Sequence, residues 1–96
     1  MGNYKLSNQA EADLYRIWLY GFQEFGEARA DIYLLAFFER FDELAENPYM
    51  YPAVDHVREG YRRSICGVDS IYFRVNGETV EIMSIIGRQN TDPLFD

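Results

Sequence analysis

The chain has 96 residues, a formal net charge of −7 at pH 7 and one cysteine. Chains of this length form one domain with a modest core, so we expect a single domain over residues 1–96. One cysteine excludes an internal disulfide and a cysteine-rich zinc site, and it suits the reducing cytoplasm. The longest apolar run covers residues 32–38, whereas a membrane-spanning helix needs about 20 residues. We therefore expect a cytoplasmic protein without a membrane anchor.

The negative charge is unevenly distributed along the chain. Residues 1–50 contain 4 basic and 9 acidic side chains, a net charge of −5, whereas residues 56–90 contain 5 basic and 4 acidic ones, a net charge of +1. Proteins that bind nucleic acids normally concentrate positive charge, because neutralising phosphates supplies most of their affinity. The overall sign of the charge therefore favours protein partners over direct contact with DNA or RNA.

The first half of the chain has the pattern of one short strand followed by two helices. Tyr4–Leu6 alternates apolar and polar residues, which indicates a strand. Ser7 or Asn8 can then cap a helix that ends at Phe25-Gly26. Its predicted buried stripe consists of Leu14, Ile17, Trp18, Gly21 and Phe25.

A second helix is predicted over residues 28–45 and is stopped by Asn47-Pro48. Because the connection to the first helix is very short, the two helices should form an antiparallel hairpin. The apolar stripe of the second helix consists of Leu34, Phe37, Phe38, Phe41, Leu44 and Ala45.

The second half of the chain has the alternation of three strands, at about residues 61–66, 70–75 and 78–86. Asn76-Gly77 predicts a two-residue type I′ turn between the last two strands. Such a turn would pair Val75 with Glu78, Phe73 with Val80, Ile71 with Ile82, Arg74 with Thr79 and Tyr72 with Glu81. The face with Ile71, Phe73, Val80 and Ile82 should then pack on the helical hairpin.

The residues capable of catalysis form no evident constellation. His56 is the only histidine and follows an aspartate in a loop, where a solvated side chain is the simplest interpretation. Cys66 precedes a glycine at a turn, and we interpret it as a passive thiol. Phosphate-binding loops, dinucleotide fingerprints and metalloprotease motifs are absent from the sequence. We expect no cofactor and no metal site.

The apolar run within the second helix has two possible explanations. One stripe suffices to pack a helix on a small core, so Ile32, Leu35 and Phe38 would face outward and form a partner surface. Alternatively, the helix is sandwiched between the first helix and the sheet, which would bury both sides. The segment 87–96 is polar but ends in Leu94 and Phe95, and it fits either a frayed terminus or an extended docking tail.

Several segments of the chain are informative as a set. They are Tyr4-Lys5-Leu6-Ser7 with Ala10-x-Ala12-Asp13-Leu14-x-x-Ile17-Trp18, Phe25-Gly26-x-x-x-Ala30-Asp31-x-Tyr33-Leu34, Leu44-Ala45-Glu46-Asn47-Pro48, Val57-Arg58-x-Gly60-Tyr61-Arg62-Arg63, Ile71-Tyr72-Phe73-Arg74-Val75 and Val80-Glu81-Ile82-x-x-Ile85-Ile86. In order and at matching spacing, these segments resemble the ParE toxins of the RelE/ParE superfamily. The resemblance extends from residue 4 to about residue 92.

This resemblance implies an α+β domain of order β-α-α-β-β-β, with a helical hairpin packed on a twisted antiparallel sheet. It also implies the toxin of a bacterial type II toxin–antitoxin system of the plasmid-maintenance type. Such a toxin inhibits DNA gyrase by binding, without catalysis of its own, and a ParD-like antitoxin neutralises it. Operator DNA is then contacted only through the antitoxin.

Two further functions stay open at this point. A RelE-like toxin would cleave ribosome-bound mRNA, with Arg62, Arg63 or Arg74 holding the phosphate and an acid or base near the end of the last strand. The chain has Gly87-Arg88-Gln89-Asn90 there, without the tyrosine or histidine of the mRNA-cleaving branch. The run after the last strand also departs from the His-Gln-Arg-Met-Asp-like run of many ParE toxins, so an inactive relic that only corepresses with its antitoxin is the third possibility.

From the resemblance and the apolar excess we predict two binding surfaces. The antitoxin, which is expected to combine apolar and acidic groups, should bind Ile32, Leu35, Phe38, Arg58, Arg62 and Arg74. The target should be bound by the C-terminal tail through Arg88, Gln89, Asp92, Leu94 and Phe95.

Overall fold

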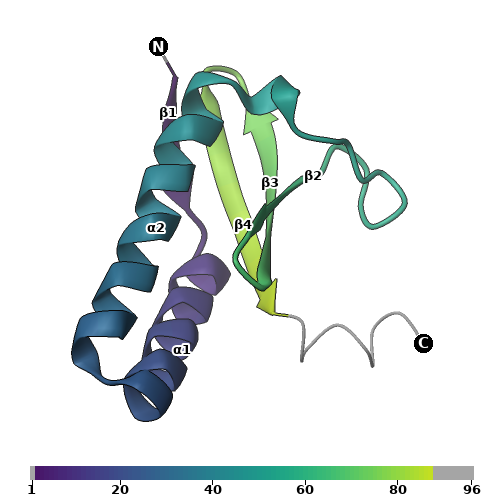
Figure 1. The fold of residues 1–96 in the computed structure, drawn as a ribbon. Coiled ribbons are helices and arrows are strands. Elements are labelled where there is room, and N and C mark those ends of the chain that lie inside the picture. Colours follow the sequence, from purple (N-terminus) through teal and green to yellow (C-terminus); the bar gives the residue numbers. More distant parts are fainter. Residues whose placement is uncertain (1, 88–96) are drawn as a thin grey trace.

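The computed structural model describes residues 2–87, and the predicted order of one strand, two helices and three strands is confirmed (Figure 1). A helical hairpin lies against one face of a four-stranded sheet. Among residues 2–87, no helix combines the length and apolar character that a membrane span requires. The elements are β1 (Asn3–Leu6), α1 (Asn8–Phe25), α2 (Glu27–Glu46), the short 3₁₀ helix η1 (Pro48–Met50), β2 (Arg62–Cys66), β3 (Asp69–Asn76) and β4 (Thr79–Gly87).

The helical hairpin is closed by a single residue. Ser7 caps α1, because its hydroxyl accepts a hydrogen bond from the Ala10 N–H at 2.9 Å. Gly26 ends α1 with a φ of 92°, and α2 begins at the next residue. Glycine reaches this backbone conformation without a Cβ penalty, so the chain can reverse within one residue.

The sheet has the strand order β1-β4-β3-β2 and is mixed rather than antiparallel. β2, β3 and β4 are antiparallel neighbours as predicted, but β1 runs parallel to β4. The direction of β1 could not be predicted, because no turn connects it to β4 and the alternation of side chains is the same in either direction.

The predicted register between β3 and β4 is wrong by two residues. Val75 faces Val80 and Phe73 faces Ile82, so the loop consists of Gly77 and the following residue. Gly77 has a φ of 64°, whereas no residue other than glycine has a positive φ in residues 2–87. A type I′ turn on Asn76-Gly77 would place an asparagine at positive φ, and the observed loop with glycine first is of the type II′ pattern. Because side chains alternate between the two faces of a sheet, a shift of two residues leaves each side chain on its predicted face.

A β-bulge in β4 changes which residues face the core. Tyr72 pairs with Ser84 and Phe73 pairs with Ile82, which leaves Met83 as an extra residue. The extra residue reverses the alternation, so Ile82 and Ile85 are both fully buried. Strict alternation would have directed Ser84 into the core instead.

The core lies between the helical hairpin and the sheet. Leu14 and Ile17 of the predicted stripe on α1 are buried, but Phe25 is 60% exposed. Phe25 is exposed because the end of the hairpin extends past the sheet (Figure 1). On α2, Leu34 and Phe38 are only half-buried. The largest fully buried side chains are Phe37, Phe41, Phe73, Leu44, Ile71, Ile82 and Ile85.

Side chains at the start of α1 form hydrogen bonds with the part of β4 that has no β1 residue beside it. The last β1–β4 pair is Leu6 with Ile82. Beyond this pair, the Ser7 hydroxyl donates to the Met83 carbonyl at 2.8 Å. Further along, the buried Asp13 carboxylate accepts from the Ile85 N–H at 2.9 Å, and Arg16 donates to the Ile85 carbonyl at 3.0 Å. These bonds fix the position of α1 on the sheet.

Replacing Asp13 by alanine should destabilise the fold, because the buried Ile85 N–H loses its acceptor. We expect the free energy of unfolding to fall by about 1–3 kcal/mol, measured by urea denaturation followed by circular dichroism. Glu24→Ala, at an exposed position near the other end of α1, should change it by less than about 0.5 kcal/mol. Equal stabilities of the two variants would contradict the role assigned to Asp13.

Candidate functional site

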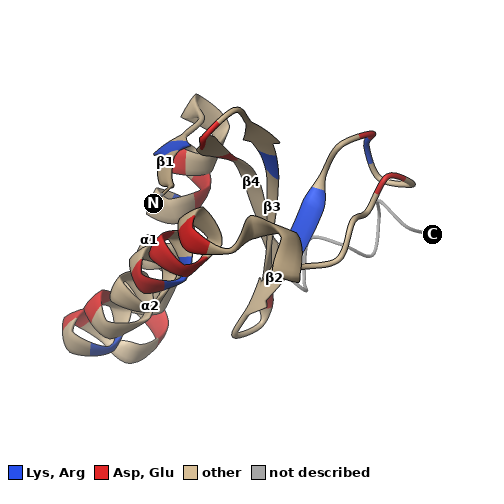
Figure 2. Ribbon diagram, turned by 90° about the horizontal axis from the view of Figure 1, so that it is seen from above, with Lys and Arg blue, Asp and Glu red and all other residues tan. Residues whose placement is uncertain are grey.

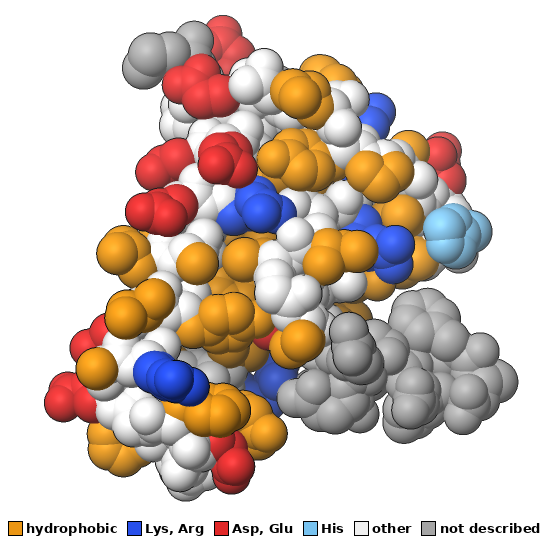
Figure 3. Space-filling model, viewed as in Figure 1, with side chains coloured by type: hydrophobic (Ala, Val, Ile, Leu, Met, Phe, Trp, Pro, Cys, Tyr) orange, Lys and Arg blue, Asp and Glu red, His pale blue; other side chains and the backbone are white. Residues whose placement is uncertain are grey.

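An apolar groove opens where the helical hairpin extends past the sheet. Its volume is about 570 Å³. Figure 3 shows hydrophobic side chains gathered between the hairpin and the sheet. The groove is lined by Arg16, Ile17, Tyr20, Gly21 and Phe25 from α1, by Arg29, Ala30, Ile32, Tyr33 and Ala36 from α2, and by Val68 and Asp69 from the β2–β3 turn.

Tyr33 holds the β2–β3 turn against α2 on one side of the groove. Its hydroxyl donates to the buried Asp69 carboxylate at 2.7 Å and lies 3.1 Å from the Cys66 carbonyl oxygen. Burial and the hydrogen bond to Asp69 raise the pKa of Tyr33, so it stays a neutral donor. A Cβ on Gly67 would contact the Tyr33 ring and hydroxyl, so the turn requires a residue without a side chain there.

Two arginines lie on the rim of the groove. Arg16 is held by its bond to the Ile85 carbonyl and lies 3.6 Å from a carboxylate oxygen of Asp13. The guanidinium of Arg29 lies 6.0 Å from the centre of the Phe25 ring, which is the geometry of a cation–π contact. The one carboxylate among the lining residues, Asp69, already accepts from Tyr33. The groove therefore suits an apolar segment with acidic groups at its edge.

The apolar run of α2 contributes to this surface only in part. Ile32 is 69% exposed and Leu35 is 58% exposed, so the sandwich explanation does not hold for these two residues. Phe38 instead lies half-buried on the other side of the helix, edge-to-face with Phe41 at 5.6 Å between ring centres. Phe38 lines a separate, shallower depression with Leu6, Glu11, Leu14, Tyr15, Trp18 and Leu34.

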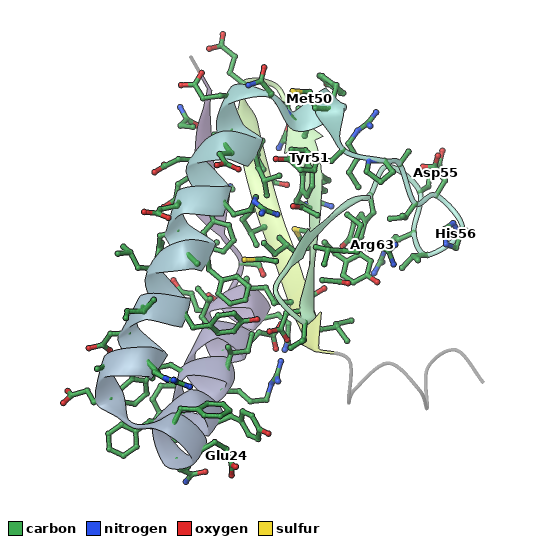
Figure 4. The ribbon with its side chains drawn as sticks, viewed as in Figure 1. Glu24, Met50, Tyr51, Asp55, His56 and Arg63 are labelled. Carbon is green, nitrogen blue, oxygen red and sulfur yellow. The ribbon has the colours of Figure 1, made fainter. Side chains whose placement is uncertain are left out.

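The three arginines predicted to bind the antitoxin do not lie beside Ile32 and Leu35. Arg58 and Arg62 belong to the segment that runs from η1 to β2, whose tip carries His56 and lies far from the hairpin end marked by Glu24 (Figure 4). Arg74 lies on the face of the sheet away from the helices and is paired with Glu81. The predicted set of residues therefore falls on separate parts of the molecule.

The residues predicted to bind the target lie outside the described residues 2–87. They are Arg88, Gln89, Asp92, Leu94 and Phe95.

The structure places His56 and Cys66, the two residues considered for catalysis, in different environments. His56 is exposed at the tip of its loop. Cys66 is buried, and burial raises the pKa of its thiol, which disfavours the reactive thiolate. No group of three or more metal-binding side chains occurs in the described part of the chain.

The groove contains residues that the sequence analysis missed, among them Tyr20, Arg29 and Val68. They come from three elements, and no local sequence pattern indicates where these elements meet.

The outer face of the sheet carries a polar cluster around Glu81. The Arg74 and Asn76 side chains donate to its carboxylate, and the Lys5 ammonium lies 3.3 Å from one of its oxygens. With the Arg74 hydrogen bond as the largest cause, these partners lower the pKa of Glu81 from 4.5 to about 2. The correct register creates this cluster, because Arg74 faces Glu81 and not Thr79 as predicted.

Stability should depend on pH through Glu81. Because its folded-state pKa of about 2 lies below the ordinary 4.5, its contribution is present above pH 4.5 and is lost as the pH falls toward 2. Glu81→Gln should flatten the curve of unfolding free energy against pH in this window, as measured by urea denaturation at each pH. Glu78→Gln in the adjacent turn keeps Glu81 and its partners and should retain the slope. An unchanged slope in Glu81→Gln would refute this assignment.

Two solved structures with the same fold are described as toxin–antitoxin systems. One, described as "Chromosomal ParDE TA system from P. aeruginosa", matches with a TM-score of 0.79 and 22% identity, over 91% of this chain and 96% of that one. Another, described as the toxin-antitoxin complex RelBE2 from Mycobacterium tuberculosis, matches with a TM-score of 0.68 and 19% identity, over 91% and 98%. These likenesses define the fold as that of the RelE/ParE toxins.

Sequence comparison identifies the branch. The family described as "ParE toxin of type II toxin-antitoxin system, parDE" matches residues 4–91. Toxin ParE1 of Caulobacter vibrioides is 36% identical over 86 residues, covering 90% of this chain and 88% of the relative. Toxin ParE1 of Mycobacterium tuberculosis is 33% identical over 84 residues, covering 86% of each. The chain belongs to the ParE toxin family of type II toxin–antitoxin systems.

Proposed function

We propose that this ParE toxin inhibits DNA gyrase by binding it, without catalysis of its own, and that a ParD-like antitoxin neutralises it. The observation that carries the proposal is the family match over residues 4–91, nearly the whole chain. Gyrase and antitoxin would both be met in the cytoplasm.

The apolar groove is the surface that we assign to the antitoxin. A segment of the antitoxin would lay apolar side chains against the groove, and its acidic groups would face Arg16 and Arg29. Of the predicted residues, Ile32 lines the groove and stays within this assignment, whereas Leu35 is exposed on the same helix without lining the groove. Acidic side chains follow both helices (Figure 2), which disfavours direct contact with operator DNA. Operator binding would therefore be the task of the antitoxin.

Purified protein should inhibit DNA supercoiling by gyrase in a concentration-dependent manner, and added antitoxin should restore the activity. Supercoiling is measured on relaxed plasmid by gel electrophoresis, with heat-unfolded protein as the control. If supercoiling persists at several-fold excess of folded protein, the gyrase proposal fails. Ribosome-dependent mRNA cleavage, lost in Arg62→Ala or Arg74→Ala, would then establish the RelE-like alternative, and normal growth on expression without antitoxin would indicate an inactive relic.

A charge placed in the groove should weaken the binding of the antitoxin. We expect Ile32→Glu to raise the dissociation constant for the antitoxin from the neighbouring reading frame at least about tenfold, since an unpaired carboxylate would be buried in an apolar interface. Ile65→Glu introduces the same change at another exposed isoleucine, on β2, and should have a small effect. Isothermal titration calorimetry measures both dissociation constants. Equal affinities for the two variants would show that the antitoxin does not bind in the groove.

A further inference from the structure

The positive charges without an ion-pair partner are concentrated in one part of the structure. Within residues 2–87, the basic side chains that form ion pairs are Lys5, Arg16, Arg40 and Arg74. The arginines of the same range that form none are Arg29, Arg58, Arg62 and Arg63. Three of these four lie within six residues of the chain. These arginines thus stand without an ion pair within residues 2–87 of a protein whose net charge is −7.

Two of the three arginines are held in place by aromatic side chains. The Arg62 guanidinium donates to the Tyr51 carbonyl at 2.7 Å and lies 4.9 Å from the centre of the Tyr49 ring. The Arg58 guanidinium lies 5.9 Å from the centre of the Tyr61 ring. Such contacts restrict the rotamers of long side chains before a partner arrives, so less entropy is lost on binding.

The loop that carries these residues is ordered by its own hydrogen bonds. The Asp55 carboxylate accepts from the Gly60 N–H at 2.8 Å, and the Val54 N–H donates to the Tyr61 carbonyl at 2.8 Å. Val54 is buried and anchors the base of the loop. At the other end, Arg63 donates its N–H to the Pro52 carbonyl at 3.1 Å. The loop is therefore a preformed projection from the sheet, as Figure 4 shows.

Exposed apolar side chains accompany the arginines. Tyr49 is 68% exposed, Met50 is 78% exposed and Val57 is 41% exposed. Tyrosine, methionine and arginine are the residue types enriched in protein–protein interfaces. The name "49–63 surface" is used below for the exposed side chains Tyr49, Met50, Val57 and Arg58 together with the half-buried Arg62 and Arg63.

We propose that the 49–63 surface is a contact through which this toxin binds gyrase, and that the gyrase surface it meets is acidic with apolar groups. This inference rests on the proposed function. A protein surface fits better than a nucleic acid, because Asp55 and Glu59 stand among the arginines and would repel a continuous line of phosphates. The groove assigned to the antitoxin lies at the end of the hairpin, away from this loop (Figure 4).

The test compares two variants with the same total charge. Arg58→Gln combined with Arg63→Gln removes two positive charges from the 49–63 surface. Asn8→Asp combined with Ala12→Glu adds two negative charges at exposed positions on α1. We expect the first variant to need an at least about tenfold higher concentration for half-inhibition of supercoiling, and the second to stay within about twofold of the unmodified protein. Both variants should bind the antitoxin as tightly as the unmodified protein does.

The outcomes separate this inference from the proposed function. If the unmodified protein inhibits gyrase and both variants inhibit it equally well, the 49–63 surface is not a contact but the proposed function stands. If the unmodified protein does not inhibit gyrase, both fail. Circular dichroism checks folding. Should the double variant not fold, the single change Arg58→Gln, at an exposed position, replaces it with an expected loss of about threefold. Loss of binding to a labelled single-stranded RNA, with supercoiling inhibition unchanged, would also overturn the inference.

Discussion

The architecture depends on how the backbone groups at the edge of β4 find hydrogen-bond partners beyond the end of β1. β1 has four residues and β4 has nine, so part of the β4 edge has no strand beside it. Buried backbone groups need partners, and here the side chains of Ser7, Asp13 and Arg16 supply them. One short segment of helix thus completes the sheet and sets the position of the whole hairpin relative to it.

The two candidate surfaces follow from this placement. Because α1 is fixed to β4 near its start, its far end and the turn at Gly26 extend past the sheet (Figure 1). Apolar residues that would be buried under a longer sheet, such as Phe25 and Ile32, line an open groove instead. The long connection from η1 to β2 projects from the opposite side. This connection and the first two residues of β2 carry Arg58, Arg62 and Arg63, which form no ion pair within residues 2–87. A small core therefore presents an apolar surface and a cationic surface that are well separated.

The sequence predicts those parts of the fold that local chemistry determines. Ser7, Gly26 and Pro48 mark the helix ends, and alternation in β3 and β4 identifies the buried face correctly. Two features could not be predicted from the sequence, because they depend on contacts between residues far apart in the chain. One is the β-bulge at Met83, whose carbonyl accepts from the Ser7 hydroxyl at the start of α1. The other is the direction of β1, which no turn constrains. The groove escaped for the same reason, since three elements far apart in the sequence form it. Because one apolar stripe of α2 suffices to pack it on the core, Ile32 and Leu35 are correctly predicted to be exposed. The same prediction is wrong for Phe38, which packs against Phe41.

The pairing of β1 with β4 also constrains when the protein can fold during synthesis. Asn3 pairs with Thr79 and Leu6 with Ile82, so the first strand has no neighbour in the sheet until residues 79–82 have been synthesised. β4 is an inner strand and supplies Val80, Ile82 and Ile85 to the core. A nascent chain that lacks β4 therefore lacks three core side chains and the strand that lies between β1 and β3. Contacts of such high sequence separation form late in folding, so the complete sheet can form only after β4 has been synthesised.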